Sequence, residues 1–102
     1  MAVVSEGRVA CRTPAEGREG VTNIPVWKFD LIRGHIAEIL SDGKPQVYNN
    51  VRDAVGARLT AEQARALGKL GWHVITVKLE LEVRGEVERV AAKGLQQIRW
   101  AG

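Results

Sequence analysis

The side chains best suited to chemistry in this chain are two histidines, one cysteine and two closely spaced glutamates. His35 and His73 stand in no recognisable metal-ligand motif, so no metal site is expected. Glu80 and Glu82 are two positions apart, and residues at that spacing do not face each other on a helix, which argues against an acid/base pair. Cys11 precedes a basic residue that could lower its pKa, but no histidine stands near it in the sequence to activate it. We therefore predict a protein that is not an enzyme, with no catalytic residue, no metal, no cofactor and no evident small-molecule ligand.

The composition fits one small globular domain. The chain has 102 residues, of which 45% are hydrophobic, and a net charge of +3. The hydrophobic fraction is enough for a core, whereas the charge is too small to indicate a dedicated nucleic-acid binder. A single cysteine excludes an internal disulfide and favours a reducing compartment. Because the sequence shows neither a signal peptide nor a membrane-spanning run, we expect a cytoplasmic protein without a membrane partner.

Turn-forming residues divide the chain into two parts. Residues 1–24 are expected to form an N-terminal arm, or a short strand followed by a loop, and residues 25–102 a domain. The first helix of that domain is expected to begin near Pro25, because proline is tolerated in a first turn, and to be capped by Thr22 or Asn23.

Two further helices are expected before residue 70. One follows Asn50, where hydrophobic residues recur four apart. The other covers residues 61–69, since Thr60 and Gln63 stand three apart as in a capping box.

The run Gly71–Val90 decides the fold, and it can be interpreted in two ways. From Val77 to Val83, hydrophobic residues alternate with charged ones, which is the period of a half-buried strand. The same run can also be wound as a helix that ends at Gly85. A hairpin is expected after it, over residues 86–100, because two strand-like runs flank Gly94.

The segment LEVRGEVERV, residues 81–90, resembles the end of the recognition helix in bacterial winged-helix regulators, including the MarR type. The segments CRTPAEGREG, PVWKFDLIRGHIAEIL and GWHVITVKLELEVRGEVERV together resemble a family of small bacterial proteins of unknown function. The stretch AEQARALGKLG departs from that family's pattern. The matching positions are Cys11, Thr13, Pro14, Gly17, Arg18, Gly20, Lys28, Phe29, Asp30, Gly71, Trp72, Val77, Lys78, Leu79, Leu81, Glu82, Arg84, Gly85, Glu88 and Arg89.

This resemblance implies the fold class and favours a helix over residues 72–84. The expected fold is mainly α with a C-terminal β-hairpin, in which a winged-helix-like three-helix core carries the hairpin as its wing. Such a helix would have two apolar faces. One would contain Val74, Val77 and Leu81. The other, nearly opposite, would contain Trp72, Ile75, Leu79 and Val83. A second apolar face needs a cover, so we predict that these four residues form an interface and that the protein is a homodimer.

Binding to duplex DNA is a second expected interaction. Arg52, Arg58 and Lys93 are the candidate contacts, because basic residues are in excess around them and phosphates attract such groups. Glu80 and Glu82 argue against DNA reading by the helix itself, because acidic side chains on its outer side would repel phosphates. The leading hypothesis is therefore a non-enzymatic winged-helix-like module associated with nucleic acid or regulation. The alternative is a protein-interaction, adaptor or dimerisation domain that does not bind DNA.

Overall fold

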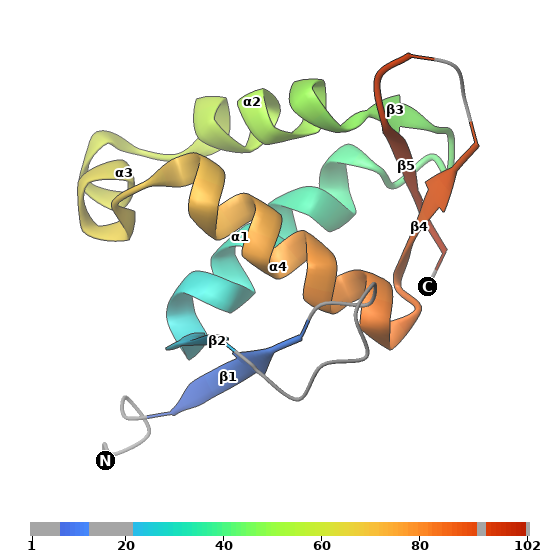
Figure 1. Ribbon diagram of the computed structural model, residues 1–102. Helices are drawn as coiled ribbons and strands as arrows, with labels where there is room; N and C mark the ends of the chain where they lie inside the picture. The colour runs from blue at the N-terminus through green and yellow to red at the C-terminus, as the bar shows by residue number, and fades with distance from the viewer. Residues whose placement is uncertain (1–6, 13–21, 92–93, 102) are drawn as a thin grey trace.

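The computed structural model describes residues 7–12, 22–91 and 94–101, and in this part of the chain it is a mixed α/β structure. It contains four helices and two small antiparallel sheets (Figure 1). The helices form the body of the molecule; in this view the two-stranded sheet lies below them and the three-stranded sheet lies to their right.

Three helices enclose the core. They are α1 (Val26–Ile39), α2 (Tyr48–Arg58) and α4 (Leu70–Arg84). Each buries residues three or four positions apart, because that spacing lines up side chains on one side of a helix. The side chains that are completely buried include Ile32, Ile36, Val51, Val55, Val74, Val77 and Leu81.

The short helix α3 (Ala61–Leu67) connects α2 to α4 and confirms the predicted capping box. The Thr60 hydroxyl accepts a hydrogen bond from the Gln63 backbone N–H at 3.0 Å, and the Gln63 side chain accepts one from the Thr60 N–H at 3.0 Å. At the other end of α3, the Lys28 ammonium of α1 donates to the Leu67 carbonyl at 3.1 Å. At both ends of this seven-residue helix, side chains therefore hydrogen-bond to backbone groups that lack a partner within the helix.

Residues 72–84 of the run that was open to two interpretations lie in a helix, α4, as the resemblance implied. Burial of its inward residues outweighs the β-propensity of its many β-branched residues, since strand preference is largely a matter of what a side chain packs against. Gly85 ends the helix in the left-handed conformation, with φ of 80°, and the Glu86 N–H then bonds back to the Leu81 carbonyl at 2.9 Å. This geometry closes α4 and turns the chain into the hairpin.

Replacing Gly85 with alanine is expected to lower the free energy of unfolding by about 1–2 kcal/mol, because an L-residue is strained at positive φ. Gly71 offers a matched control in the first turn of the same helix. A Cβ there would meet no atom within 4 Å, and its φ is not in the left-handed region. Gly71→Ala should therefore be neutral or slightly stabilising in the same urea titration. Equal stability of the two variants would contradict this account of the helix end.

The C-terminal sheet confirms the predicted hairpin and adds a strand to it. Strands β4 (Val87–Val90) and β5 (Gln97–Trp100) are antiparallel. Gly94 lies between them with a positive φ of 85°. The added strand, β3 (Gln46–Val47), pairs with the other side of β5, so that the order in the sheet is β3-β5-β4.

Helix α1 begins near Pro25 as predicted, but the N-terminal sheet corrects its predicted cap. Strands β1 (Arg8–Cys11) and β2 (Thr22–Pro25) pair antiparallel, so Thr22 and Asn23 are strand residues and not helix caps. Pro25 occupies the cap position of α1 and makes no side-chain capping bond. Cys11 and Ile24 are buried in the core, which attaches this sheet to the helices.

Candidate functional site

The outward side of α4 is an apolar surface that is partly open to solvent. Trp72 is 47% exposed, and Ile75, Leu79 and Val83 are partly buried. These four residues, here called the α4 face, recur at intervals of three and four positions and therefore form one stripe. The structure thus places all four predicted interface residues together, on the side opposite Val74, Val77 and Leu81.

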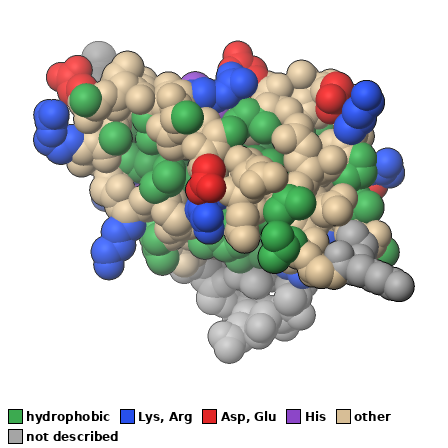
Figure 2. Space-filling model, turned by 90° about the horizontal axis from the view of Figure 1, so that it is seen from above, with side chains coloured by type: hydrophobic (Ala, Val, Ile, Leu, Met, Phe, Trp, Pro, Cys, Tyr) green, Lys and Arg blue, Asp and Glu red, His purple; other side chains and the backbone are tan. Residues whose placement is uncertain are grey.

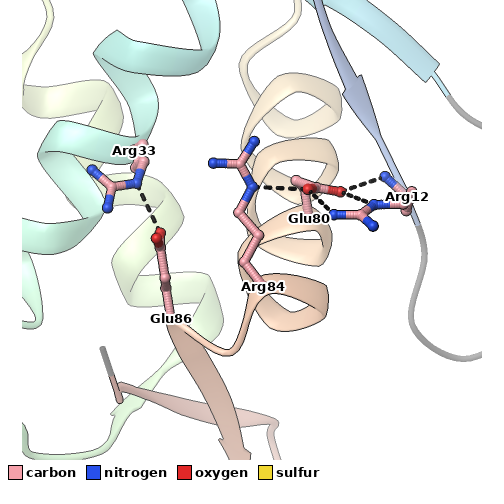
Figure 3. Close-up of polar contacts among 5 residues, drawn as sticks. All are labelled: Arg12, Arg33, Glu80, Arg84 and Glu86. Carbon is pink, nitrogen blue, oxygen red and sulfur yellow. Dashed lines mark hydrogen bonds and ion pairs between the residues drawn. The ribbon is translucent and has the colours of Figure 1, made fainter.

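The charged residues of α4 lie beside this stripe, and those before Arg84 do not extend into solvent. Glu80 is 1% exposed and is held by two arginines (Figure 3). The Arg12 guanidinium donates to both of its carboxylate oxygens, at 3.0 and 2.7 Å, and the Arg12 backbone N–H donates at 2.8 Å. On the other side, Arg84 Nε donates at 2.8 Å and its guanidinium lies 4.7 Å from the centre of the Phe29 ring. Glu80 therefore attaches the end of β1 to α4.

These contacts decide the ionisation of Glu80. Burial alone would raise the pKa of its carboxyl. The hydrogen bonds from Arg12 and Arg84 outweigh burial and lower the pKa to about 2. The group is therefore a carboxylate at neutral pH, where it has no proton to give as a general acid.

A second buried charge connects α4 to the hairpin. Lys78 is 1% exposed, and its ammonium donates to Gln96 Oε1 at 2.7 Å and forms an ion pair with Glu82. It also lies 5.4 Å from the centre of the Tyr48 ring. Glu82 is paired in turn with Arg89 of β4 at 2.9 Å. Burial lowers the pKa of Lys78, and the bond to Glu82 opposes that effect.

Glu80 and Glu82 do not lie exposed on the outer side of this helix, as the argument against DNA reading assumed. Glu80 is buried, and the Glu82 side chain is only 8% exposed. His73 is also buried, with Nδ1 2.7 Å from the Lys69 carbonyl. The Thr76 hydroxyl donates to the Trp72 carbonyl at 2.7 Å. Between Trp72 and Val83, α4 therefore presents hydrophobic side chains outward, and its charges are engaged elsewhere.

A further ion pair joins α1 to the start of the hairpin. Arg33 Nε donates to Glu86 Oε1 at 2.8 Å (Figure 3). The same guanidinium lies 5.6 Å from the centre of the Trp100 ring on β5. The hairpin is thus connected by side chains to both α1 and α4.

The predicted DNA contacts are not brought together as a free basic patch in the described part of the chain. Arg52 pairs with Asp53 at 3.1 Å, and Arg58 pairs with Glu38 at 2.9 Å. Lys93 lies outside the described residues. Figure 2 shows the face above α2, where basic side chains lie beside acidic ones at several places with hydrophobic side chains between them.

The pKa of Cys11 also differs from the expectation based on its basic neighbour, Arg12. Cys11 is buried, and its pKa is raised to about 11, first by burial and then by the nearby Glu80 carboxylate. Arg84 and Arg12 act in the opposite direction but do not outweigh these effects. Arg12 therefore acts on this thiol in the expected direction, but the pKa of Cys11 is raised and not lowered. No cluster of three or more potential metal ligands occurs among residues 7–12, 22–91 and 94–101.

Sequence reasoning missed the buried ion pairs, although a local signal for them exists. Lys78 and Glu82 are four residues apart, as are Glu80 and Arg84, and on a helix such pairs are neighbours. A helix over this run therefore already predicts both of these ion pairs. Nothing local indicated that Arg12 would complete one of them.

The fold and the surface together define a small α/β domain with a hydrophobic helix face open to solvent and its helix charges paired internally. The chain belongs to a family of unknown function, DUF6958, whose model matches residues 8–97. That match extends from β1 to the start of β5. No curated protein and no solved structure matches the chain. None of the helices in the described residues combines the length and apolar character needed to cross a membrane.

Proposed function

We propose that this protein is a non-enzymatic winged-helix-like module that binds a second copy of itself through the α4 face. The winged-helix part is supported by the order of the elements. Helices α1, α2 and α4 surround one core, and the hairpin β4–β5 follows the last of them. Strand β3, which lies between α1 and α2 in the sequence, pairs with the other side of β5, so that the sheet has the order β3-β5-β4. In that architecture α4 occupies the position of the recognition helix and β4–β5 that of the wing.

The chemistry of α4 supports a protein partner in preference to DNA. A recognition helix reads base edges with polar and basic side chains. The α4 face instead offers Trp72, Ile75, Leu79 and Val83, while Lys78 and Glu80 are buried. Hydrophobic side chains flanked by paired charges are typical of the centre of a protein interface, where a tryptophan often contributes most of the binding energy.

A second copy is the partner that this surface fits best. The stripe is uncharged, so two copies related by a two-fold axis bring no like charges together at its centre. It extends over twelve residues, or about 18 Å of helix. In an antiparallel pair, Trp72 of one copy would lie near Val83 of the other, and the Leu79 side chains would lie near the axis. The same proposal places the module in a reducing bacterial cytoplasm, which its single cysteine and its resemblance to bacterial proteins support.

Replacing Leu79 with glutamate is the direct test. The wild-type protein is expected to sediment as a dimer at micromolar concentrations and the Leu79→Glu variant as a monomer, because two glutamates would meet in the apolar interface. Ala57→Glu is the control: this residue is exposed on α2, so the variant should remain a dimer. Circular dichroism of all three proteins separates a lost interface from lost folding. A wild-type protein that is monomeric at all accessible concentrations would refute the proposed dimer.

The same wild-type protein can be used to test the alternative that the module binds duplex DNA. We expect no mobility shift of random duplex DNA at low salt. A salt-sensitive shift that disappears when Arg52, Arg58 and Lys93 are changed to glutamate would instead favour a nucleic-acid-binding module.

A further inference from the structure

The outward side of α1 is a second surface, separate from the α4 face and different in chemistry. Trp27 is 46% exposed near the start of the helix. Asp30, Gly34 and Glu38 follow it at the helical spacing and are also exposed, and Leu31 is partly buried between them. Unlike the α4 face, this surface combines hydrophobic groups with acidic ones.

The centre of this surface is a shallow, open hollow at Gly34, which has no side chain. The hollow is lined by Asp30, Leu31, Gly34, His35 and Glu38. A Cβ at Gly34 would meet no atom within 4 Å, so the space is open to an incoming group. Four of these residues, at positions 31, 34, 35 and 38, have the spacing that forms a hole for one side chain of a neighbouring helix. A glycine at such a position also lets two helices approach closely.

The charges around the hollow restrict what can occupy it. Asp30 lies on one side, and Glu38, which is 66% exposed, lies on the other. Glu38 is partly neutralised by Arg58 at 2.9 Å, and His35 Nδ1 is 3.9 Å from the same carboxylate oxygen. A second copy of α1 would bring the same acidic groups against them and be repelled. Lysine or arginine side chains, by contrast, would gain from both carboxylates.

We infer that the α1 surface binds a helix of a different protein, one that carries a hydrophobic side chain flanked by basic residues. The hydrophobic side chain enters the hollow over Leu31, and the basic groups lie against Asp30 and Glu38. Trp27 packs against the next turn of the partner helix. This inference does not depend on the proposed dimer, since it concerns a different helix face.

A pair of synthetic helical peptides tests the inference. Both are about 18 residues long, which is enough for a stable alanine-based helix, and both carry one leucine on the contact side. One has arginines three and four positions from the leucine, and the other has glutamates there. In a ¹⁵N-labelled sample, the arginine peptide is expected to shift the amide signals of residues 30–38, Gly34 among them, and the glutamate peptide to leave them unchanged.

Variants of the protein complete the test. Gly34→Leu fills the hollow and is expected to weaken binding of the arginine peptide about tenfold. Ala57→Leu adds the same side chain to an exposed site on α2 and should not change it. Asp30→Asn combined with Glu38→Gln should weaken binding and reduce its dependence on salt. Unchanged affinity in the Gly34→Leu variant, or equal shifts with both peptides, would overturn the inference.

Discussion

Replacing Lys78 with alanine is expected to lower the free energy of unfolding by about 3–4 kcal/mol, the largest effect of any charge removal in the described structure. The side chain is 1% exposed and joins α4 to the hairpin through Gln96 and to Glu82 on its own helix. Alanine leaves a cavity where the aliphatic part of the lysine lay. It also leaves the Gln96 amide oxygen without this donor and Glu82 with Arg89 as its remaining ion-pair partner.

Lys78→Met separates the two causes. Methionine keeps most of the buried volume but removes the ammonium, and well-packed hydrophobic replacements of buried charges are often tolerated. We expect this variant to lose less than half of what the alanine variant loses in urea titrations at neutral pH. If both variants lose the same amount, the charge contributes most of the stabilisation and the packing argument fails. If neither is destabilised, Lys78 does not link α4 to the hairpin in the way described.

Replacing Glu80 with glutamine is expected to lower the free energy of unfolding by about 2 kcal/mol at neutral pH and to change its response to acid. In the folded protein the pKa of Glu80 is about 2, lower than the ordinary value of 4.5. Its stabilising contribution is therefore complete above about pH 4.5 and is lost as the pH falls towards 2. Glutamine has no such titration, so the variant should lose less stability than the wild type between these two pH values.

Glu38→Gln is a suitable control for that measurement. Glu38 is also paired with an arginine, but its side chain is 66% exposed, and exposed pairs contribute at most about 1 kcal/mol. Its effect at neutral pH should be small. The role assigned to Glu80 requires a difference in slope between wild type and Glu80→Gln in acid. Parallel stability curves from pH 5 to pH 2 would show that the carboxylate is not the acid-sensitive group.

The parts of the fold that could be predicted from the sequence are those determined by neighbouring residues. Gly85 and the Thr60–Gln63 capping box are local signals, and both are present in the structure as expected. The strand β3 was not predictable, because two residues carry no periodicity of their own and Gln46 and Val47 become a strand only by pairing with β5. Thr22 was misassigned for a related reason. Its side chain suits a helix cap, but its pairing with Cys11 makes it a strand residue.

The candidate sites show the same difference between features set by neighbouring residues and features set by residues far apart in the sequence. The α4 face was predictable because a helical wheel separates Trp72 and Leu79 from the buried Val77 and Leu81. The burial of Glu80 was not, because it depends on Arg12, which is 68 residues away in the sequence. The hollow at Gly34 was also missed, since a glycine within a helix gives no sign in the sequence of which neighbours remain open around it.

The separation between Arg12 and Glu80 also determines when the N-terminal sheet can be completed during synthesis. At about 5–20 residues per second, Glu80 is added roughly 3–14 s after Arg12. An isolated two-stranded sheet is at best marginally stable in water, so β1 and β2 gain little from pairing before α4 exists. Strand β1 precedes every other element in the described residues, yet it is among the last to be fixed in place. A nascent chain stopped before residue 80 lacks the carboxylate that holds it.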